Sequence, residues 1–211
     1  KNIRMSSLSV LQRREFDREA RIQDSFLQSQ NEEYVPNREV QKDLENLCER
    51  ESQIVLAYGP KGSGKSGMLC NWVKDRRHRN AIVGRKDELV FYHNAGCSRA
   101  SAEIAELLRR VCQSAEKILT ARDTFSSNYE EGGVSETKLI RKFHRILESL
   151  SSGNLSIVMV VDGANHLKGS NPERSAYWLP VRLPENLRVI FGVTTETDLD
   201  KVMKSGKVFL T

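Results

Sequence analysis

Residues 59–66 form a complete GxxxxGK[ST] motif, Gly59-Pro60-Lys61-Gly62-Ser63-Gly64-Lys65-Ser66. The apolar run 53–58 before it is predicted to be a buried strand, and residues 67–74 are predicted to begin a helix. Glycines let backbone N–H groups turn toward a polyphosphate, and the amino end of a helix adds partial positive charge. The flanking strand and helix distinguish the motif from a glycine-rich turn that ends in Lys-Ser by chance, so we predict a nucleotide-binding site.

The parts of this phosphate loop have separate predicted roles. Lys65 is expected to reach the β- and γ-phosphates, and the hydroxyl of Ser66 is expected to ligate Mg²⁺. The other residues expected to line the phosphates are Gly59, Pro60, Lys61, Gly62, Ser63, Gly64 and Gly67. The predicted ligands are ATP or GTP with Mg²⁺. We favour ATP, although no single motif in the sequence encodes the base.

The composition excludes several classes of protein. With 211 residues, 38% of them hydrophobic and 29% charged, the chain is predicted to fold as one domain of ordinary size, with or without an appended segment. No run approaches the length of a membrane-spanning helix, so we expect a cytoplasmic protein that makes no membrane contact. The first residue is Lys1, so we expect a piece of a longer protein. Four widely spaced cysteines predict buried, reduced thiols, not a zinc or disulfide framework: Cys48, Cys70, Cys97 and Cys112.

The formal net charge of +5 is modest, but basic residues gather after the helix that follows the loop. They are Lys74, Arg76, Arg77, His78 and Arg79. Cations are favourable at the carboxyl end of a helix, which makes a solvated helix end the preferred interpretation. A nucleic-acid-binding patch is the alternative, and we do not expect nucleic acid as the partner.

Apolar runs and helical spacing alternate along the chain. An amphipathic or largely exposed helix is expected within 6–31, and Ser-, Asn- and Gly-rich residues 122–135 are expected to form a loop. Strands are predicted at 53–58, 88–93, 156–161, 187–193 and 208–210, and further helices at 40–47, 100–119 and 138–150. This alternation predicts an α/β fold of three layers, with a mostly parallel sheet that binds ligands at the carboxyl ends of its strands.

Asp162 follows the most strand-like run of the chain and is predicted to orient the Mg²⁺ that Ser66 holds. One predicted strand lies in sequence between Lys65 and Asp162. This interval leaves room for a strand inserted between the loop strand and the acid strand, as in the additional-strand division of P-loop ATPases.

A hydrolase also needs a group that orients or deprotonates the attacking water. The positions after Asp162 contain Asn165 and His166 but no acid. Asn165 could hydrogen-bond a water without accepting its proton, and His166 could accept one. We therefore expect slow or absent hydrolysis. After the run 187–193, Thr194 or Thr195 is expected to lie beside Asp162 and to sense the γ-phosphate through its hydroxyl. The alternative is that a β-branched residue stands there only because it favours a strand.

Several further motifs accompany these two. They are Tyr34-Val35-Pro36-Asn37-Arg38, Phe91 to Ser98, Val160 to Leu167, Trp178-Leu179-Pro180, Leu183-Pro184, Leu187 to Ile190 and Thr194-Thr195. With the phosphate loop, this succession resembles STAND-type P-loop NTPases, the NACHT-related signalling switches, and especially their nephrocystin, telomerase-associated and tetratricopeptide-repeat members. The resemblance covers residues 34–200.

The resemblance implies a core in which nucleotide binding switches a multidomain chain between closed and assembly-competent states. It places a helical segment at 1–33 and a NACHT-like domain at 34–211, with helical, winged-helix and repeat regions expected after Thr211. Those outside regions would bind protein partners, and a nucleotide-dependent oligomer is possible. It also implies that Val35 and Arg38 hold the base. The family often has a second acid where this chain has Asn165, and many relatives have Arg where it has Glu196, which agrees with weak catalysis.

Three alternatives stay open on the sequence. A small-molecule P-loop kinase fits the length and the loop, but its acid usually stands close behind the loop strand. A DNA-associated AAA+ ATPase fits the basic charge, although no arginine finger or lid domain is recognisable. A degenerate binder without catalysis fits the missing second acid.

Overall fold

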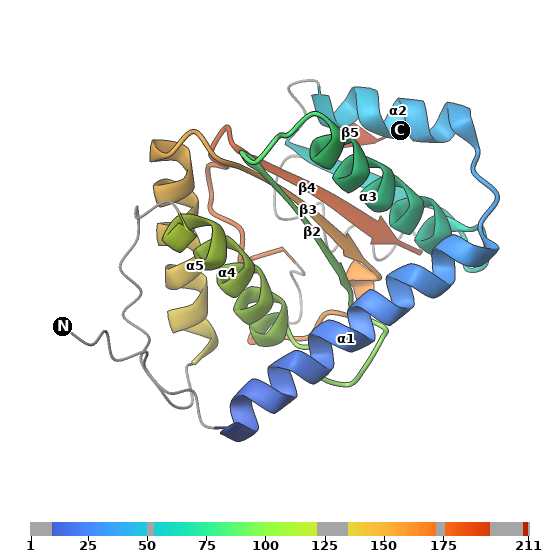
Figure 1. Cartoon of the computed structure of the whole chain (residues 1–211). Helices are drawn as coiled ribbons and strands as arrows, with labels where there is room; N and C mark the ends of the chain where they lie inside the picture. Colours follow the sequence, from blue (N-terminus) through green and yellow to red (C-terminus); the bar gives the residue numbers. More distant parts are fainter. Residues whose placement is uncertain (1–9, 50–52, 122–134, 172–175, 195–208, 211) are drawn as a thin grey trace.

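The computed structural model describes residues 10–49, 53–121, 135–171, 176–194 and 209–210. Helices and strands alternate along the described residues (Figure 1). The helices are α1 (Val10–Glu33), α2 (Arg38–Glu49), α3 (Lys65–Ile82), α4 (Ile104–Ala121), α5 (Glu136–Ser152) and the short 3-10 helix η1 (Ala164–His166). The strands are β1 (Ile54–Tyr58), β2 (Glu88–Asn94), β3 (Ser156–Asp162), β4 (Leu187–Val193) and β5 (Phe209–Leu210).

The strands form one sheet in the order β2-β3-β4-β1-β5, and every pairing in it is parallel. A strand therefore does stand between the loop strand β1 and the acid strand β3, which confirms the additional-strand arrangement. The inserted strand is β4, which follows Asp162 in sequence. The strand that lies between Lys65 and Asp162 in sequence is β2, and it forms the edge of the sheet.

Helices cover both faces of this sheet (Figure 1). Alternate residues of β3 point to opposite faces, as a pleated strand requires. Met159 and Val161 pack with α4 and α5 in one core, whereas Val158 and Val160 pack with α2 and α3 in the other. The three-layer α/β fold predicted from the alternating pattern is thus confirmed.

Helix α1 packs against α3 and the carboxyl end of β2, and Figure 1 shows it crossing there obliquely. Its apolar residues Phe26 and Leu27 are partly buried against the core on the α3 side. Two of its polar side chains are buried as well, Glu19 at 6% exposure and Gln23 at 1%. We expected an amphipathic or largely exposed helix, and that expectation did not include the polar face of α1 on which Glu19 and Gln23 are buried. The division at residue 34 stays a prediction.

Several helix boundaries differ from the predicted ones. Helix α4 begins at Ile104 and not near residue 100, because Ser98 and Ser101 hydrogen-bond each other's backbone N–H groups in a turn. Helix α3 contains the predicted first turns at 67–74 and continues to Ile82. The predicted loop 122–135 lies almost entirely outside the described residues. Among the helices that the structure describes, none combines the length and apolar character needed to span a membrane.

Candidate functional site

The phosphate loop connects β1 to α3 at the carboxyl edge of the sheet. Gly62 and Gly64 have φ angles of 84° and 85°, a backbone region that side chains with a Cβ rarely adopt. Gly64 is the N-cap of α3, and no side chain among the described residues caps this helix end. The first N–H groups of α3 therefore face the loop, as binding of an anion requires.

Lys65 turns its ammonium group back into the loop. Its Nζ donates to the carbonyl of Gly59 at 2.6 Å and of Pro60 at 2.8 Å, and lies 3.3 Å from the Ser63 hydroxyl. Partial burial lowers the pKa of Lys65, and the negative charge of Asp162 opposes that shift. The ammonium lies in the loop after β1 and the predicted metal-orienting carboxylate lies at the end of β3, both at the carboxyl edge of the sheet.

Asp162 ends β3 with only 3% of its surface exposed. Its Oδ2 accepts a hydrogen bond of 2.7 Å from Asn94 Nδ2 and one of 3.2 Å from the Tyr92 hydroxyl. Burial, and then the charge of Asp162, raise the pKa of Tyr92 well above its usual value. Two donors on one oxygen thus fix the orientation of this carboxylate.

The other carboxylate oxygen lies over Gly192, on the strand that separates β3 from β1. A Cβ at position 192 would stand 2.6 Å from Asp162 Oδ1 and 3.0 Å from a methyl group of Leu69. Gly192 is the register partner of Ala57, near the end of the loop strand. The missing side chain at 192 therefore lets Asp162 extend across β4 toward α3. Sequence analysis missed Gly192, Asn94 and Tyr92, because each becomes relevant only through strand order.

Gly67 lies in the first turn of α3 and faces the 34–38 segment. A Cβ at this position would be 2.6 Å from the Cδ2 atom of Tyr34. The structure thus shows a packing role for Gly67, which was predicted to line the phosphates. The Tyr34 ring fixes the segment against the start of α3, a role that sequence analysis did not assign.

The residues after Tyr34 are exposed to solvent. Val35 is 86% exposed, and Arg38 is the exposed first residue of α2. Asn37 caps α2, since its Oδ1 accepts from the N–H groups of Glu39 at 3.1 Å and Val40 at 3.4 Å. The two predicted base contacts therefore stand on a segment whose start is anchored beside the phosphate loop.

Beyond Asp162 the chain turns through Gly163, with φ 66°, into η1. The Oδ1 atom of Asn165 is buried and has no hydrogen-bond partner among the described residues, and its Nδ2 lies 3.4 Å from His166 Nε2. Thr194 directly follows β4 and is half-buried, whereas Thr195 and Glu196 lie outside the described residues. An acceptor without a partner three residues after Asp162 is a candidate for holding a water or ligand.

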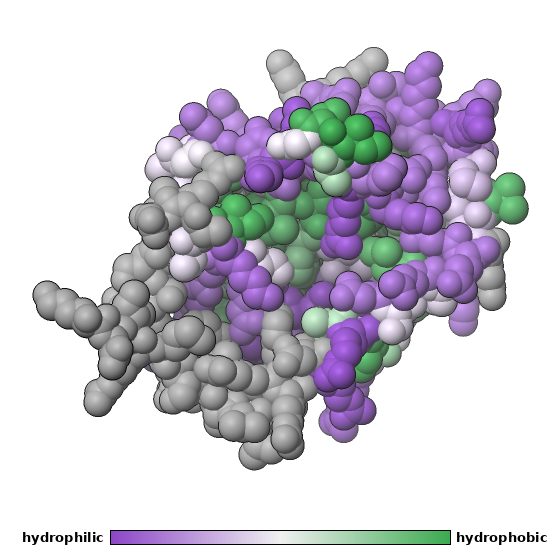
Figure 2. Space-filling view, in the orientation of Figure 1, coloured by the Kyte–Doolittle hydropathy of each residue, from purple (hydrophilic) through white to green (hydrophobic). Residues whose placement is uncertain are grey.

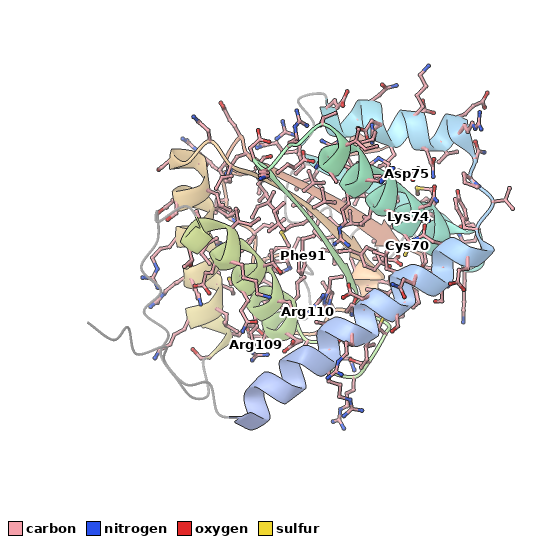
Figure 3. The ribbon with its side chains drawn as sticks, in the orientation of Figure 1. Cys70, Lys74, Asp75, Phe91, Arg109 and Arg110 are labelled. Carbon is pink, nitrogen blue, oxygen red and sulfur yellow. The ribbon has the colours of Figure 1, made fainter. Side chains whose placement is uncertain are left out.

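Much of the basic cluster after the loop is used inside the molecule. Arg76 pairs with Glu45 at 2.7 Å and Glu88 at 2.8 Å, and Arg77 donates to the Val90 carbonyl at 2.9 and 3.0 Å. Arg79 pairs with Glu45 at 2.8 Å. In Figure 3, Lys74 and the neighbouring Asp75 are labelled on α3. These contacts favour a helix end that fastens α2 and β2 over a free nucleic-acid patch.

One cavity lies away from this site. It measures about 570 Å³ and is lined by Asp87, Ser151, Asn154, Leu155, Ser156, Glu185 and Asn186. These residues stand at the amino ends of the strands, whereas the loop and Asp162 stand at the carboxyl ends. The cavity therefore takes no part in the site described above.

Comparison with known proteins agrees with the motifs. The chain is 25% identical over 159 residues to mouse (Mus musculus) telomerase protein component 1, a match that covers 74% of this chain and 6% of that protein. It is 30% identical over 148 residues to nephrocystin-3 of Xenopus laevis, which covers 68% of this chain and 10% of that protein. The chain thus spans about a tenth or less of the curated relatives it matches. No family model matches it.

Solved structures show the same fold. The Aeropyrum pernix ORC1 protein, solved in complex with DNA, superposes with a TM-score of 0.58 at 18% identity, over 84% of this chain and 45% of that chain. The Aeropyrum pernix ORC2 protein, solved as ADPNP–ADP complexes, gives 0.52 at 12% identity, over 86% and 50%. The chain is therefore a P-loop NTPase core of the NACHT and STAND kind, distantly homologous to nephrocystin-3 and telomerase protein component 1. The resemblance predicted from its motifs is confirmed.

Proposed function

We propose that this chain binds ATP in preference to GTP, together with Mg²⁺, as the nucleotide-responsive core of a signalling switch that hydrolyses slowly or not at all. One observation carries the proposal. The Lys65 ammonium lies inside the phosphate loop and the Asp162 carboxylate extends over Gly192, and both groups stand at the carboxyl edge of the sheet. A triphosphate with its metal needs such a pair.

The roles of the residues follow from this geometry. A triphosphate on the loop would compete with the Gly59 and Pro60 carbonyls for Lys65, because its charge is a stronger acceptor. The backbone of residues 59–67 would supply N–H donors. The Ser66 hydroxyl and the Asp162 carboxylate offer the oxygen ligands that Mg²⁺ prefers. Because the described residues contain no cluster of three metal-binding side chains, Mg²⁺ would depend on the phosphates as well. Bound there, it would neutralise phosphate charge.

The residues that follow Asp162 and β4 support the proposal of slow hydrolysis. Asn165 offers a buried acceptor that could orient a water but cannot take its proton. The predicted sensor of the γ-phosphate is the hydroxyl of Thr194, the residue directly after β4. With no carboxylate at 163–167, we propose that bound ATP persists long enough to act as a signal.

The base would lie near the 34–38 segment. Tyr34 anchors this segment at Gly67, and the exposed Val35 side chain offers an apolar surface to a purine ring. Arg38 could hydrogen-bond the base or its sugar. The partners that respond to the switch would be proteins bound by other regions, since the matched relatives are much longer, and assembly would depend on nucleotide.

We also place the protein in the cytoplasm. All four cysteines are free, and burial raises the pKa of the Cys48, Cys70, Cys97 and Cys112 thiols to about 12. Unpaired thiols of this kind persist in a reducing compartment.

Calorimetric titration with ATP, GTP and ADP, each with and without Mg²⁺, tests the proposal. We expect micromolar or tighter binding of Mg²⁺–ATP, about −8 kcal/mol or better. Lys65→Ala should abolish it. The matched control is Lys74→Ala, which removes an exposed cation from the same helix. Wild-type affinity in the Lys65 variant would refute the assigned role.

A second function has one observation in its favour, because the ORC1 protein that shares the fold was solved with DNA. A DNA-associated ATPase of this kind would show DNA binding that weakens steeply with salt. The internal contacts of Arg76 and Arg77 argue against it. We expect no binding to duplex DNA above the non-specific level.

A further inference from the structure

Gln23 of α1 forms a complete amide pair with the backbone of Asn94. The Asn94 N–H donates to Gln23 Oε1 at 2.8 Å, and Gln23 Nε2 donates to the Asn94 carbonyl at 2.9 Å. Asn94 is the last residue of β2, the edge strand of the sheet. The side chain of Gln23 therefore occupies the place of a neighbouring strand, and it is buried there with 1% exposure.

A second contact from α1 is made with Ser98, in the segment that follows β2. Glu19, one turn before Gln23, accepts from the Ser98 hydroxyl at 2.8 Å and from Gln23 Nε2 at 3.2 Å. Residues four apart share one face of a helix, so one polar face of α1 contacts both Asn94 and Ser98. The outward surface along α1 is mainly polar (Figure 2), whereas Glu19 and Gln23 are buried beneath it.

Asn94 connects this contact to the metal-orienting carboxylate. Its backbone is paired with Gln23, while its side chain donates to Asp162 Oδ2 at 2.7 Å and accepts from the Gly96 N–H at 2.7 Å. Asn94 and Asp162 are also register partners on β2 and β3. A shift of α1 would break its two hydrogen bonds to the Asn94 backbone, and Asn94 is one of the two groups that orient the Asp162 carboxylate.

We infer that Gln23 and Asn94 are positioning residues for Asp162, through which the docking of α1 sets how well the site binds Mg²⁺ with its nucleotide. The inference rests on the proposed function. Groups that hold a metal-ligating carboxylate in place commonly change metal affinity by about 10- to 100-fold when they are removed. The coupling is reciprocal, so a bound Mg²⁺–nucleotide must favour the docked position of α1 to the same extent.

The test compares Gln23→Met with Gln28→Met in residues 1–211. Methionine has a similar volume and removes the amide. Gln28 is exposed on the same helix, so its variant is a matched control. ATP affinity is measured by calorimetry with Mg²⁺ and with chelator. For Gln23→Met we expect the gain in affinity from Mg²⁺ to fall about tenfold, with affinity in chelator unchanged. Gln28→Met should match the wild type.

Each outcome decides the matter. An unchanged Mg²⁺ gain in folded Gln23→Met overturns the inference and leaves the proposed function standing. An equal loss with and without Mg²⁺ also overturns it, because that result indicates general damage. If wild type binds no nucleotide, the proposed function fails and the inference with it. Should Gln23→Met not fold, Ser98→Ala removes the Glu19 contact at a half-buried site, together with the hydrogen bonds between the Ser98 hydroxyl and Ser101 in the same turn. A smaller loss of the Mg²⁺ gain in this variant supports the inference, and none contradicts it.

Discussion

The phosphate loop and the surroundings of Asp162 are built in opposite ways. In the loop, the contacts of Lys65 reach back at most six residues, to Gly59. Around Asp162, the hydrogen bond from Asn94 spans 68 residues, that between Gln23 and Asn94 spans 71, and that between Glu19 and Ser98 spans 79. One half of the site is local in sequence and the other is assembled from three distant segments.

This difference predicts how each half responds to change. A local loop depends on backbone conformation, so its glycines contribute through the φ angles they allow. The assembled half depends on close packing between elements, so a single added methyl group forces a strand or helix to move. The following changes separate the two kinds of sensitivity.

The largest effect is expected at Gly192. Gly192→Val places atoms where Asp162 Oδ1 and Leu69 already stand, 2.6 and 3.0 Å from the new Cβ. We expect a loss of about 2–3 kcal/mol in the free energy of unfolding, measured in urea, because the core is overpacked. The Mg²⁺-dependent part of ATP binding should disappear as well. Gly192→Ala should show a smaller loss of both. A valine variant with wild-type stability and Mg²⁺ response would show that Asp162 does not lie against this strand.

Low pH should reduce the free energy of unfolding, because His93 is buried near the assembled half of the site. Burial and the nearby Arg110 lower the pKa of His93 from 6.5 to about 3, and its ring contacts Arg110 at 2.8 Å and the Ser101 carbonyl at 2.7 Å. Figure 3 labels Arg110 together with Phe91, whose ring lies 5.1 Å from the guanidinium carbon. Below pH 6.5 the unfolded state binds a proton that the folded state does not, so stability falls as pH falls, until about pH 3.

For His93 alone we expect a loss of about 2 kcal/mol between pH 7 and pH 5. Urea unfolding at pH 7, 6 and 5 measures it. His93→Gln should remove this part of the slope, whereas the exposed His78→Gln should keep it. Equal slopes in both variants would mean that His93 titrates normally in the folded protein.

Gly67 tests the contact between the loop helix and the 34–38 segment. Gly67→Ala brings a Cβ to 2.6 Å from the Tyr34 ring, so we expect a net loss of about 1 kcal/mol in unfolding free energy. In a Tyr34→Ala background the contact is absent, and the same substitution should stabilise by about 0.5–1 kcal/mol through helix propensity. The double-mutant cycle measures the coupling. Additive effects would contradict the packing.

The smallest effect is expected at Gly62. Its φ of 84° disfavours alanine, but no atom lies within 4 Å of an added Cβ. Gly62→Ala should cost about 0.5 kcal/mol, since strain in the folded state is partly offset by a less flexible unfolded chain. Thermal unfolding with and without Mg²⁺–ATP checks that ligand stabilisation persists. Loss of that stabilisation would show that the loop is as tightly constrained as the Gly192 position.

Sequence patterns predicted the α/β class, the strand order type and the positions of the strands to within a residue or two. They succeeded because an apolar run such as that at Ile157 to Val161 has few alternatives to a buried parallel strand. Sequence patterns could not identify β4 as the inserted strand, because the residues of Leu187–Val193 do not determine which strands will pair with it. Trp178 illustrates the same limit. Its motif contributes to the family resemblance, but only the structure shows that its side chain is fully buried against Phe143 and Phe191.

From the residues alone, the loop, its lysine and the acid at a strand end could be recognised, because each depends on neighbours within a few positions. The orientation of Asp162 across Gly192 came from the fold, and so did the contacts of Asn94, Gln23 and Tyr34. Those contacts join segments about 30 to 80 residues apart, and their partners are chosen by which elements pack together. Short-range chemistry thus predicted the ligand class, and long-range packing arranged the groups that would control it.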